Sequence, residues 1–254
     1  MKDINIYQLR LEKSLEQKMF FLTKVKIEDY DLIVDFGSGT GALLGRLASE
    51  VNKDVTLIGY DNSSEMIKVS RQKDLNNRII FTDNFAVVEE SLRLAKKSMI
   101  IFSTVLHEID IETQFSIIYN VMPMFNTVVV RDMKRPSNNE PISNMTRKRI
   151  LAQVAPWQAQ MYENHWGKIR DKENLYRFFL MNEFVENFET EVKEDYFSVL
   201  WNDIIWELNK KGFEIFYERS YTLPYRKKQV QKVFKHTMHD ITHKELIMIR
   251  REGK

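Results

Sequence analysis

The feature that most constrains the fold is a regular alternation of short apolar runs with stretches of helical periodicity between residues 30 and 131. A short apolar run bounded by turn residues indicates a buried strand, and apolar residues three and four apart indicate a helix. Strands that alternate with helices form a parallel sheet, because each helix carries the chain back to the start of the next strand. The expected strands are 32–36, 55–60, 79–82, 98–102 and 127–131, and the expected helices are 41–50, 63–74, 86–96 and 111–122.

The alternation stops after the fifth strand, where a polar segment with two prolines begins. Residues 137–194 contain no strand-like run, so we expect a helical insertion there. Its helices are predicted to run through 147–166 and 173–192.

The sheet pattern then resumes, with a helix at 196–210 that ends near Gly212 and strands at 213–221 and 244–250. No full-length helix is expected between these strands, which suggests an antiparallel pair. We therefore predict an α/β fold with a doubly wound, mostly parallel seven-stranded sheet, a C-terminal antiparallel hairpin and a helical insertion after the fifth strand.

The N-terminal segment is predicted to be an amphipathic helix over residues 5–25 that packs on the rest of the protein. Its apolar positions recur at helical spacing: Ile6, Leu9, Leu15, Met19 and Leu22. We expect one domain over residues 1–254, with a helical lead-in at 1–29 and an acceptor lid at 137–194.

Composition excludes several classes of protein. The absence of cysteine excludes disulfides, thiolate metal sites and a cysteine nucleophile. The 38 Lys and Arg residues nearly balance the 36 Asp and Glu residues, so no overall field attracts nucleic acids or membranes. No signal core and no run of about 20 apolar residues is found. We expect a cytoplasmic protein without a membrane partner.

A glycine cluster follows the first strand in "VDFGSGTGALL". Gly37, Gly39 and Gly41 precede a helix from Ala42, and backbone amides at a helix N-terminus attract anions. The same letters match a dinucleotide-binding pattern, with Asp61 at the end of the next strand to bind ribose hydroxyls. The glycines alone therefore do not distinguish the two kinds of cofactor.

Three residues favour a nucleoside that carries an amino acid. Asp35 places a carboxylate beside the loop, which suits an amine and is unfavourable beside a pyrophosphate. Met66 could pack on an adenine face, and Asp83 could accept a bond from an adenine amino group. Some of the candidate residues have a plainer interpretation, because Asp61 or Asp83 could cap the next helix and Met66 could belong to the core.

Together, "VDFGSGTGALL", "LIGYDNSSEMI" and "FTDNF" resemble the glycine, ribose and adenine motifs of the class I S-adenosylmethionine-dependent methyltransferases, over residues 30 to 135. The two last strands also resemble the antiparallel hairpin of that family. The resemblance implies S-adenosylmethionine as cofactor, with Asp35, Gly37 and Gly39 at the methionine portion, Asp61 at the ribose and Asp83 at the adenine. The predicted cofactor residues are Asp35, Gly37, Ser38, Gly39, Gly41, Asp61, Asn62, Met66, Asp83, Asn84, Phe85, Ser103 and Thr104.

Candidate catalytic residues follow the fourth and fifth strands. Ligands bind at the carboxyl ends of such strands, near the switch point between the first and fourth strands. His107 and Glu108 are the available bases there, and Asp132 ends the fifth strand. Methyl transfer needs a base only for a poorly acidic acceptor, so His107 could instead serve packing or orientation.

The absence of two sequence features reduces the range of possible methyl acceptors. The chain lacks the Asn-Pro-Pro-Tyr or Asp-Pro-Pro-Tyr sequence of enzymes that methylate exocyclic amines of nucleic acids, and it has no cysteine for attack on a pyrimidine ring. An oxygen or ring-nitrogen acceptor is therefore expected.

Two basic stretches favour a nucleic acid or nucleotide over a small metabolite as acceptor. Their residues are Lys134, Arg135, Arg147, Lys148 and Arg149 in the first, and Arg226, Lys227, Lys228, Lys232 and Lys235 in the second. Aromatic residues of the insertion could stack on bases, although their helical spacing fits a core better: Trp157, Tyr162, Trp166, Tyr176, Phe178 and Phe179.

Three histidines, His236, His239 and His243, have a spacing that could bind zinc on one helical face. The last strand is expected to begin near His243 and to break that face, so no metal is predicted. The predicted function is a methyltransferase that acts on an oxygen or nitrogen atom. The alternatives are a small-metabolite methyltransferase and a non-catalytic scaffold of the same fold.

Overall fold

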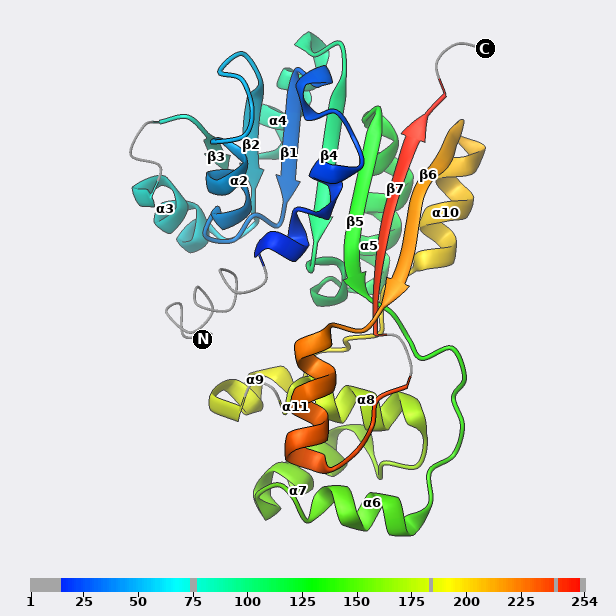
Figure 1. The fold of residues 1–254 in the computed structure, drawn as a ribbon. Coiled ribbons are helices and arrows are strands. Elements are labelled where there is room, and N and C mark those ends of the chain that lie inside the picture. Colours follow the sequence, from blue (N-terminus) through cyan, green and yellow to red (C-terminus); the bar gives the residue numbers. More distant parts are fainter. Residues whose placement is uncertain (1–14, 74–76, 183–184, 240–241, 252–254) are drawn as a thin grey trace. The chain divides into compact units, whose positions relative to one another are not determined.

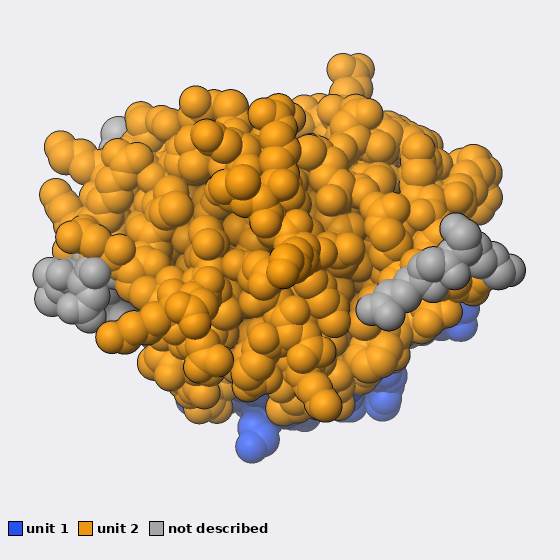
Figure 2. All heavy atoms as spheres, turned by 90° about the horizontal axis from the view of Figure 1, so that it is seen from above, with its two compact units in different colours: residues 1–3, 133–199, 219–244 blue, residues 4–132, 200–218, 245–254 orange. Residues whose placement is uncertain are grey.

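The computed structural model describes residues 15–73, 77–182, 185–239 and 242–251. They divide into two compact units, which Figure 2 shows in orange and blue. The sheet unit comprises the described residues among 4–132, 200–218 and 245–254, and the helical unit comprises those among 133–199 and 219–244.

The sheet has seven strands in the order β3-β2-β1-β4-β5-β7-β6. Neighbouring strands from β3 to β5 pair in parallel. In Figure 1 the arrow of β7 opposes those of β5 and β6, so the predicted doubly wound, mostly parallel sheet with antiparallel C-terminal strands is confirmed. The strands are β1 (Leu32–Phe36), β2 (Thr56–Tyr60), β3 (Ile80–Thr82), β4 (Ser98–Ser103), β5 (Thr127–Met133), β6 (Phe213–Tyr221) and β7 (His243–Arg250).

Both faces of the central strands are buried, which explains why these strands read as continuous apolar runs. Ile33 and Ile101 belong to one core cluster with Leu43. Leu32 and Val34 point to the opposite face, because side chains alternate along a strand, and they are buried too. The helices of this unit are α2 (Ala42–Leu47), α3 (Ser64–Lys73), α4 (Phe85–Leu94), α5 (Ile111–Ser116) and α10 (Trp201–Lys210).

Two predicted helices of this unit differ most from the structure. The helix expected at 111–122 is an α-helix only to Ser116, and a π-helical segment (η4, Ile117–Val121) and a 3-10 turn (η5, Met122–Met124) follow it. Pro123 has no amide hydrogen for an α-helical bond, which favours the 3-10 turn. The helix expected from residue 196 begins at Trp201, because the Asp195 carboxylate accepts the Phe197 amide in a local turn instead.

The N-terminal segment is only partly described. Residues 15–18 are helical, and 3-10 turns follow at η1 (Phe20–Thr23) and η2 (Ile27–Asp29). Met19 and Phe21 are buried in the core. The expected contacts of Ile6 and Leu9 lie outside the described residues. None of the helices in the described ranges has the length and apolar character needed to cross a membrane.

The helical unit contains α6 (Asn144–Leu151), α7 (Pro156–Trp166), α8 (Lys172–Met181), η6 (Val185–Asn187), α9 (Phe188–Glu191) and α11 (Pro224–Phe234). The helix expected through 147–166 is broken in two, because Pro156 begins α7 and holds Ala155 in an extended conformation. Most of the insertion's aromatic residues are core residues: Tyr162, Tyr176, Phe178 and Phe179 are buried.

The expectation that no full-length helix separates the last two strands is wrong. Helix α11 lies between them in the sequence. Its Val230 and Phe234 pack in the core of the helical unit, where the Phe234 ring lies 4.7 Å from the ring of Phe179. The lid role of residues 137–194 stays a prediction.

Candidate functional site

A cavity of about 360 Å³ lies in the sheet unit, where β1, β2 and β4 end. Its position matches the rule that ligands bind beyond the carboxyl ends of parallel strands, near the switch point. Its volume is in the range of small-ligand sites. The lining includes eight of the predicted site residues: Asp35, Gly37, Ser38, Asp61, Asn62, Ser103, Thr104 and Glu108.

The glycine loop uses its own amides within the protein. The amides of Gly37 and Ser38 donate to the Tyr60 carbonyl at 2.8 and 2.9 Å, and the Gly39 amide donates to Asp61 Oδ2 at 2.8 Å. The amides of Gly37, Ser38 and Gly39 are therefore not available to an anion, because Tyr60 and Asp61 already supply their acceptors. This loop does not suit a pyrophosphate.

Asp61 connects the loop to the start of α3. Its Oδ2 accepts from Gly39 and its Oδ1 accepts the Ser63 amide at 2.9 Å. Each carboxylate oxygen has a second lone pair, and the residue lines the cavity. Asp61 can thus support the loop and still accept ribose hydroxyls.

We expect Asp61→Ala to weaken S-adenosylhomocysteine binding by about 1–3 kcal/mol, because a part-buried charged acceptor is lost. Titration calorimetry measures the change. Asp54→Ala is the matched control, since Asp54 is exposed and lies outside the cavity lining. Unchanged affinity in Asp61→Ala would remove the ribose assignment.

The predicted adenine residues lie outside the cavity lining. Asp83 is exposed, and Asn84 caps α4 with its side chain. Met66 is half-buried on α3. The Phe85 ring packs edge-on against the Tyr60 ring at 5.3 Å, and Tyr60 does line the cavity. The adenine roles of Asp83, Asn84, Met66 and Phe85 stay predictions.

Sequence reasoning missed Lys18. This lysine lines the cavity from the N-terminal segment and is only 7% exposed. Burial lowers its pKa to about 8, with a further lowering by Arg131. A signal was present, because Lys18 lies three residues after Leu15 and four before Leu22, on the apolar stripe of that segment.

Asp35 is the penultimate residue of β1 and is buried. Burial raises its pKa to about 7, while the nearby Lys18 opposes that rise and Asp61 adds to it. An ammonium group beside Asp35 would favour the ionised carboxylate.

We therefore expect the affinity for S-adenosylhomocysteine to increase as the pH rises toward about 7. Below that pH, binding should release a proton, because the ligand's ammonium group binds the ionised form of Asp35. Calorimetry in phosphate and in Tris measures the proton release. Asp35→Asn should remove this part of the pH dependence; a variant with an unchanged profile would contradict the assignment.

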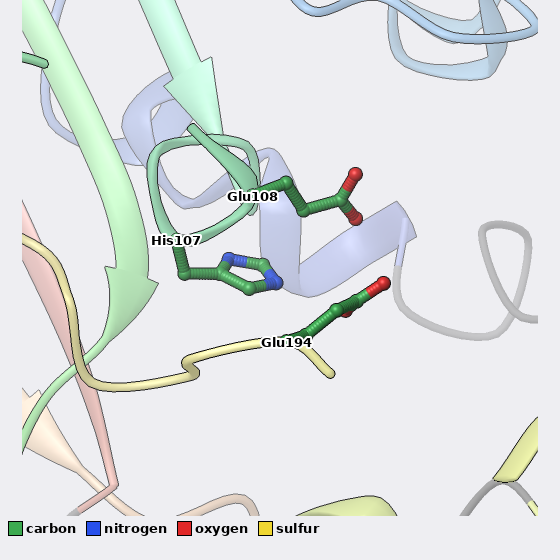
Figure 3. Close-up of side chains that lie close together, drawn as sticks. All are labelled: His107, Glu108 and Glu194. Atoms are coloured by element: carbon green, nitrogen blue, oxygen red, sulfur yellow. The ribbon is translucent and has the colours of Figure 1, made fainter. Parts of the chain in front are cut away.

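His107 and Asp132 form a buried pair. His107 lies on the turn η3 (Leu106–Glu108) after β4, beside Glu108 (Figure 3), and Asp132 lies at the end of β5. His107 Nδ1 is 2.7 Å from Asp132 Oδ1. Asp132 Oδ2 also accepts the amides of Val105 and Leu106, at 3.1 and 2.8 Å. Asp132 thus fixes both the turn and the imidazole.

Thr104, between β4 and this turn, has a φ of 58°. A β-branched residue rarely adopts this left-handed conformation, and such strain concentrates at functional sites. The Thr104 amide donates to the Arg131 carbonyl at 2.7 Å, which holds the conformation.

Several residues of the two basic stretches are buried or make contacts within the protein. Arg147 pairs with Glu163, Lys134 donates to Ser220, Arg135 donates to the Phe197 carbonyl, and Arg226 is buried. The exposed members are Lys148, Arg149, Lys227, Lys228, Lys232 and Lys235.

The three histidines do not share a helical face. Helix α11 ends at Phe234, before His236 and His239. His243 begins β7 and its Nδ1 contacts the Thr242 hydroxyl.

Comparison with known proteins decides the family. A family model described as a methyltransferase domain matches residues 27–183, more than half of the chain. The chain belongs to this family. It is an S-adenosylmethionine-dependent methyltransferase, as its motifs predict. No curated protein matches the sequence.

Solved structures show the same fold. A SAM-dependent methyltransferase from Archaeoglobus fulgidus has a TM-score of 0.50 and 12% identity, with 98% of this chain and 95% of that chain covered. An O-methyltransferase family protein from Burkholderia thailandensis has a TM-score of 0.54 and 12% identity, with 99% and 60% covered. The cyclase SpnF has a TM-score of 0.51 and 13% identity, with 94% and 82% covered. The methyltransferase spans only 46–57% of four further solved proteins.

The cavity fits the cofactor of this methyltransferase. Within the described residues, the hydroxyl oxygens of Ser38 and Ser103 are buried and have no hydrogen-bond partner, and both residues line the cavity. Buried hydroxyls are normally bonded, so a polar ligand is expected there. Asp35 suits the ammonium group of S-adenosylmethionine, and Asp61 suits its ribose.

Proposed function

We propose that this methyltransferase acts on an oxygen atom, with His107 as the proton acceptor and Asp132 as the residue that orients it. The observation that carries the proposal is the buried bond between His107 Nδ1 and Asp132 Oδ1. An ionised carboxylate only accepts hydrogen bonds, so Nδ1 carries the hydrogen and Nε2 keeps its lone pair.

S-adenosylmethionine would supply a methyl group bound to a positively charged sulfur; as that carbon–sulfur bond breaks, its electron pair would stay on the sulfur and S-adenosylhomocysteine would leave. The cavity residues hold the cofactor and exclude water, and they align the acceptor with the methyl group. His107 Nε2 takes the proton that the acceptor hydroxyl loses as its oxygen bonds to the methyl carbon. Asp132 and the nearby Glu108 then stabilise the imidazolium, since carboxylate and ring atoms of Glu108 and His107 lie within 4.8 Å.

An oxygen acceptor explains the buried pair of His107 and Asp132 better than an amine acceptor does. A neutral amine attacks with its own lone pair, whereas an alcohol or phenol gains strongly in nucleophilicity when a base removes its proton. A carboxylate that holds a buried imidazole in one tautomer is the arrangement that such a reaction needs.

For the acceptor molecule, our proposal is a nucleic acid or nucleotide. The exposed lysines of α11, Lys227, Lys228 and Lys232, support it, because lysines bind phosphates through charge. The internal contacts of Arg147 and Arg226 weaken it. A small metabolite is the alternative.

Labelled S-adenosylmethionine tests both parts of the proposal. The methyltransferase is incubated with nuclease-treated and untreated cell extract, and the label is followed into the RNA and small-molecule fractions. Label that enters RNA, or that enters nucleotides purified from the small-molecule fraction, supports the proposed acceptor, and label confined to other small molecules contradicts it. Hydrolysis of the product then shows whether the methyl group is on oxygen; a methyl group on nitrogen would overturn the oxygen assignment.

A further inference from the structure

We infer that Lys18 and Asp35 together form a subsite for an α-amino acid zwitterion, in which Lys18 binds the carboxylate of the cofactor's methionine portion. The inference rests on cofactor binding at the cavity described above. It adds a residue from the N-terminal segment that no cofactor motif contains.

The two groups face the same cavity with opposite charges. Lys18 and Asp35 both line it, and both side chains are nearly buried. They interact electrostatically, yet within the described part of the chain neither makes a direct ion pair or a side-chain hydrogen bond. Burial of a charge without a bonded partner is costly. A ligand with an ammonium group and a carboxylate would satisfy both.

Charge around the cavity makes Lys18 necessary for such a ligand. The lining contains four carboxylates, Asp35, Asp61, Glu108 and Asp110, and Lys18 is the single cationic side chain among the described lining residues. A ligand carboxylate would be repelled by the acids, so it is stable only beside the lysine.

The other charges near Lys18 do not replace it. Arg131 and Asp132 also act on Lys18, but neither lines the cavity. Asp132 is bonded to His107 and to the turn after β4.

The loop amides do not replace Lys18 either. The amides of Gly37, Ser38 and Gly39 donate to Tyr60 and Asp61, so they cannot bind a carboxylate without a rearrangement of the loop.

A comparison of two ligands isolates the effect of Lys18 on binding of the amino-acid portion. S-adenosylhomocysteine carries the amino acid, and 5′-methylthioadenosine has the same nucleoside without it. For Lys18→Met we expect calorimetry to show at least a tenfold loss of affinity for S-adenosylhomocysteine and less than a twofold change for 5′-methylthioadenosine. Lys24→Met is the matched control, because the Lys24 ammonium lies over the Tyr217 ring and the residue does not line the cavity. It should change neither affinity.

Lys18→Arg tests the charge in a second variant and should keep most of the preference for S-adenosylhomocysteine. Equal losses for both ligands in Lys18→Met would show a packing role and overturn the inference, as would unchanged affinity for S-adenosylhomocysteine. Wild-type protein that binds neither ligand would instead overturn the cofactor site itself. Wild-type protein that binds both equally would overturn only the zwitterion subsite.

Discussion

His107→Asn should lower kcat by about 100-fold or more while the affinity for S-adenosylhomocysteine stays unchanged, since general-base catalysis contributes about 10²–10⁴-fold. Asparagine can still donate a hydrogen bond to Asp132, so the turn after β4 keeps its support. It cannot accept a proton at neutral pH. Single-turnover transfer of labelled methyl groups measures the chemical step, and calorimetry measures the affinity.

The pH profile and a control separate catalysis from positioning. The acid limb of the rate profile should disappear in His107→Asn, because that limb reports protonation of the base. His165→Asn is the control, since His165 is an exposed histidine that packs against Trp166. A parallel loss of rate and affinity in His107→Asn would indicate that His107 only positions ligands.

Asp132→Asn should cost both rate and stability. Asp132 holds the imidazole through Oδ1 and the backbone of the turn through Oδ2. An amide can keep only part of this pattern, because one of its two ends is a donor. We expect a lower midpoint of urea unfolding together with a lower kcat; a variant with a wild-type rate would contradict the proposed role of the pair.

Gly37→Ala should destabilise the fold by about 2–5 kcal/mol. The φ of Gly37 is 74°, which costs a side-chain residue about 1–2 kcal/mol. A Cβ atom there would lie 2.3 Å from Val105 Cγ2 and 3.0 Å from Val105 Cβ, and overpacking costs about 1–3 kcal/mol more. Urea unfolding measures the loss. Cofactor affinity should fall as well, because Gly37 and Val105 both line the cavity.

Two further variants test the cause. Gly45→Ala is the matched control: no atom lies within 4 Å of the added carbon, and alanine favours a helix by up to about 1 kcal/mol. Val105→Ala in the Gly37→Ala background should recover the part of the loss due to the Cγ2 contact at 2.3 Å, but not the part due to φ. A Gly37→Ala protein as stable as wild type would contradict the close approach of the loop to Val105.

The site itself was only partly predictable. Asp35 and Asp61 follow strands in family motifs, and the structure places both in the cavity. The pairing of His107 with Asp132 could not be derived, because the two residues are 25 positions apart and meet only since β4 and β5 are neighbours. The position of Lys18 on the apolar stripe indicates burial, but only the tertiary structure shows the cavity that it lines.

The sequence by itself determined the secondary-structure elements and the α/β class of the fold. The predicted strands 32–36 and 213–221 have the observed bounds, because apolar runs and turn residues are local signals. The tertiary structure decided which distant polar groups satisfy one another. It assigned the loop amides to Tyr60 and Asp61, and it joined α11 to the insertion's core. Local periodicity indicates which face of a helix or strand is buried. The residues against which that face packs depend on strand order and on packing across the whole chain.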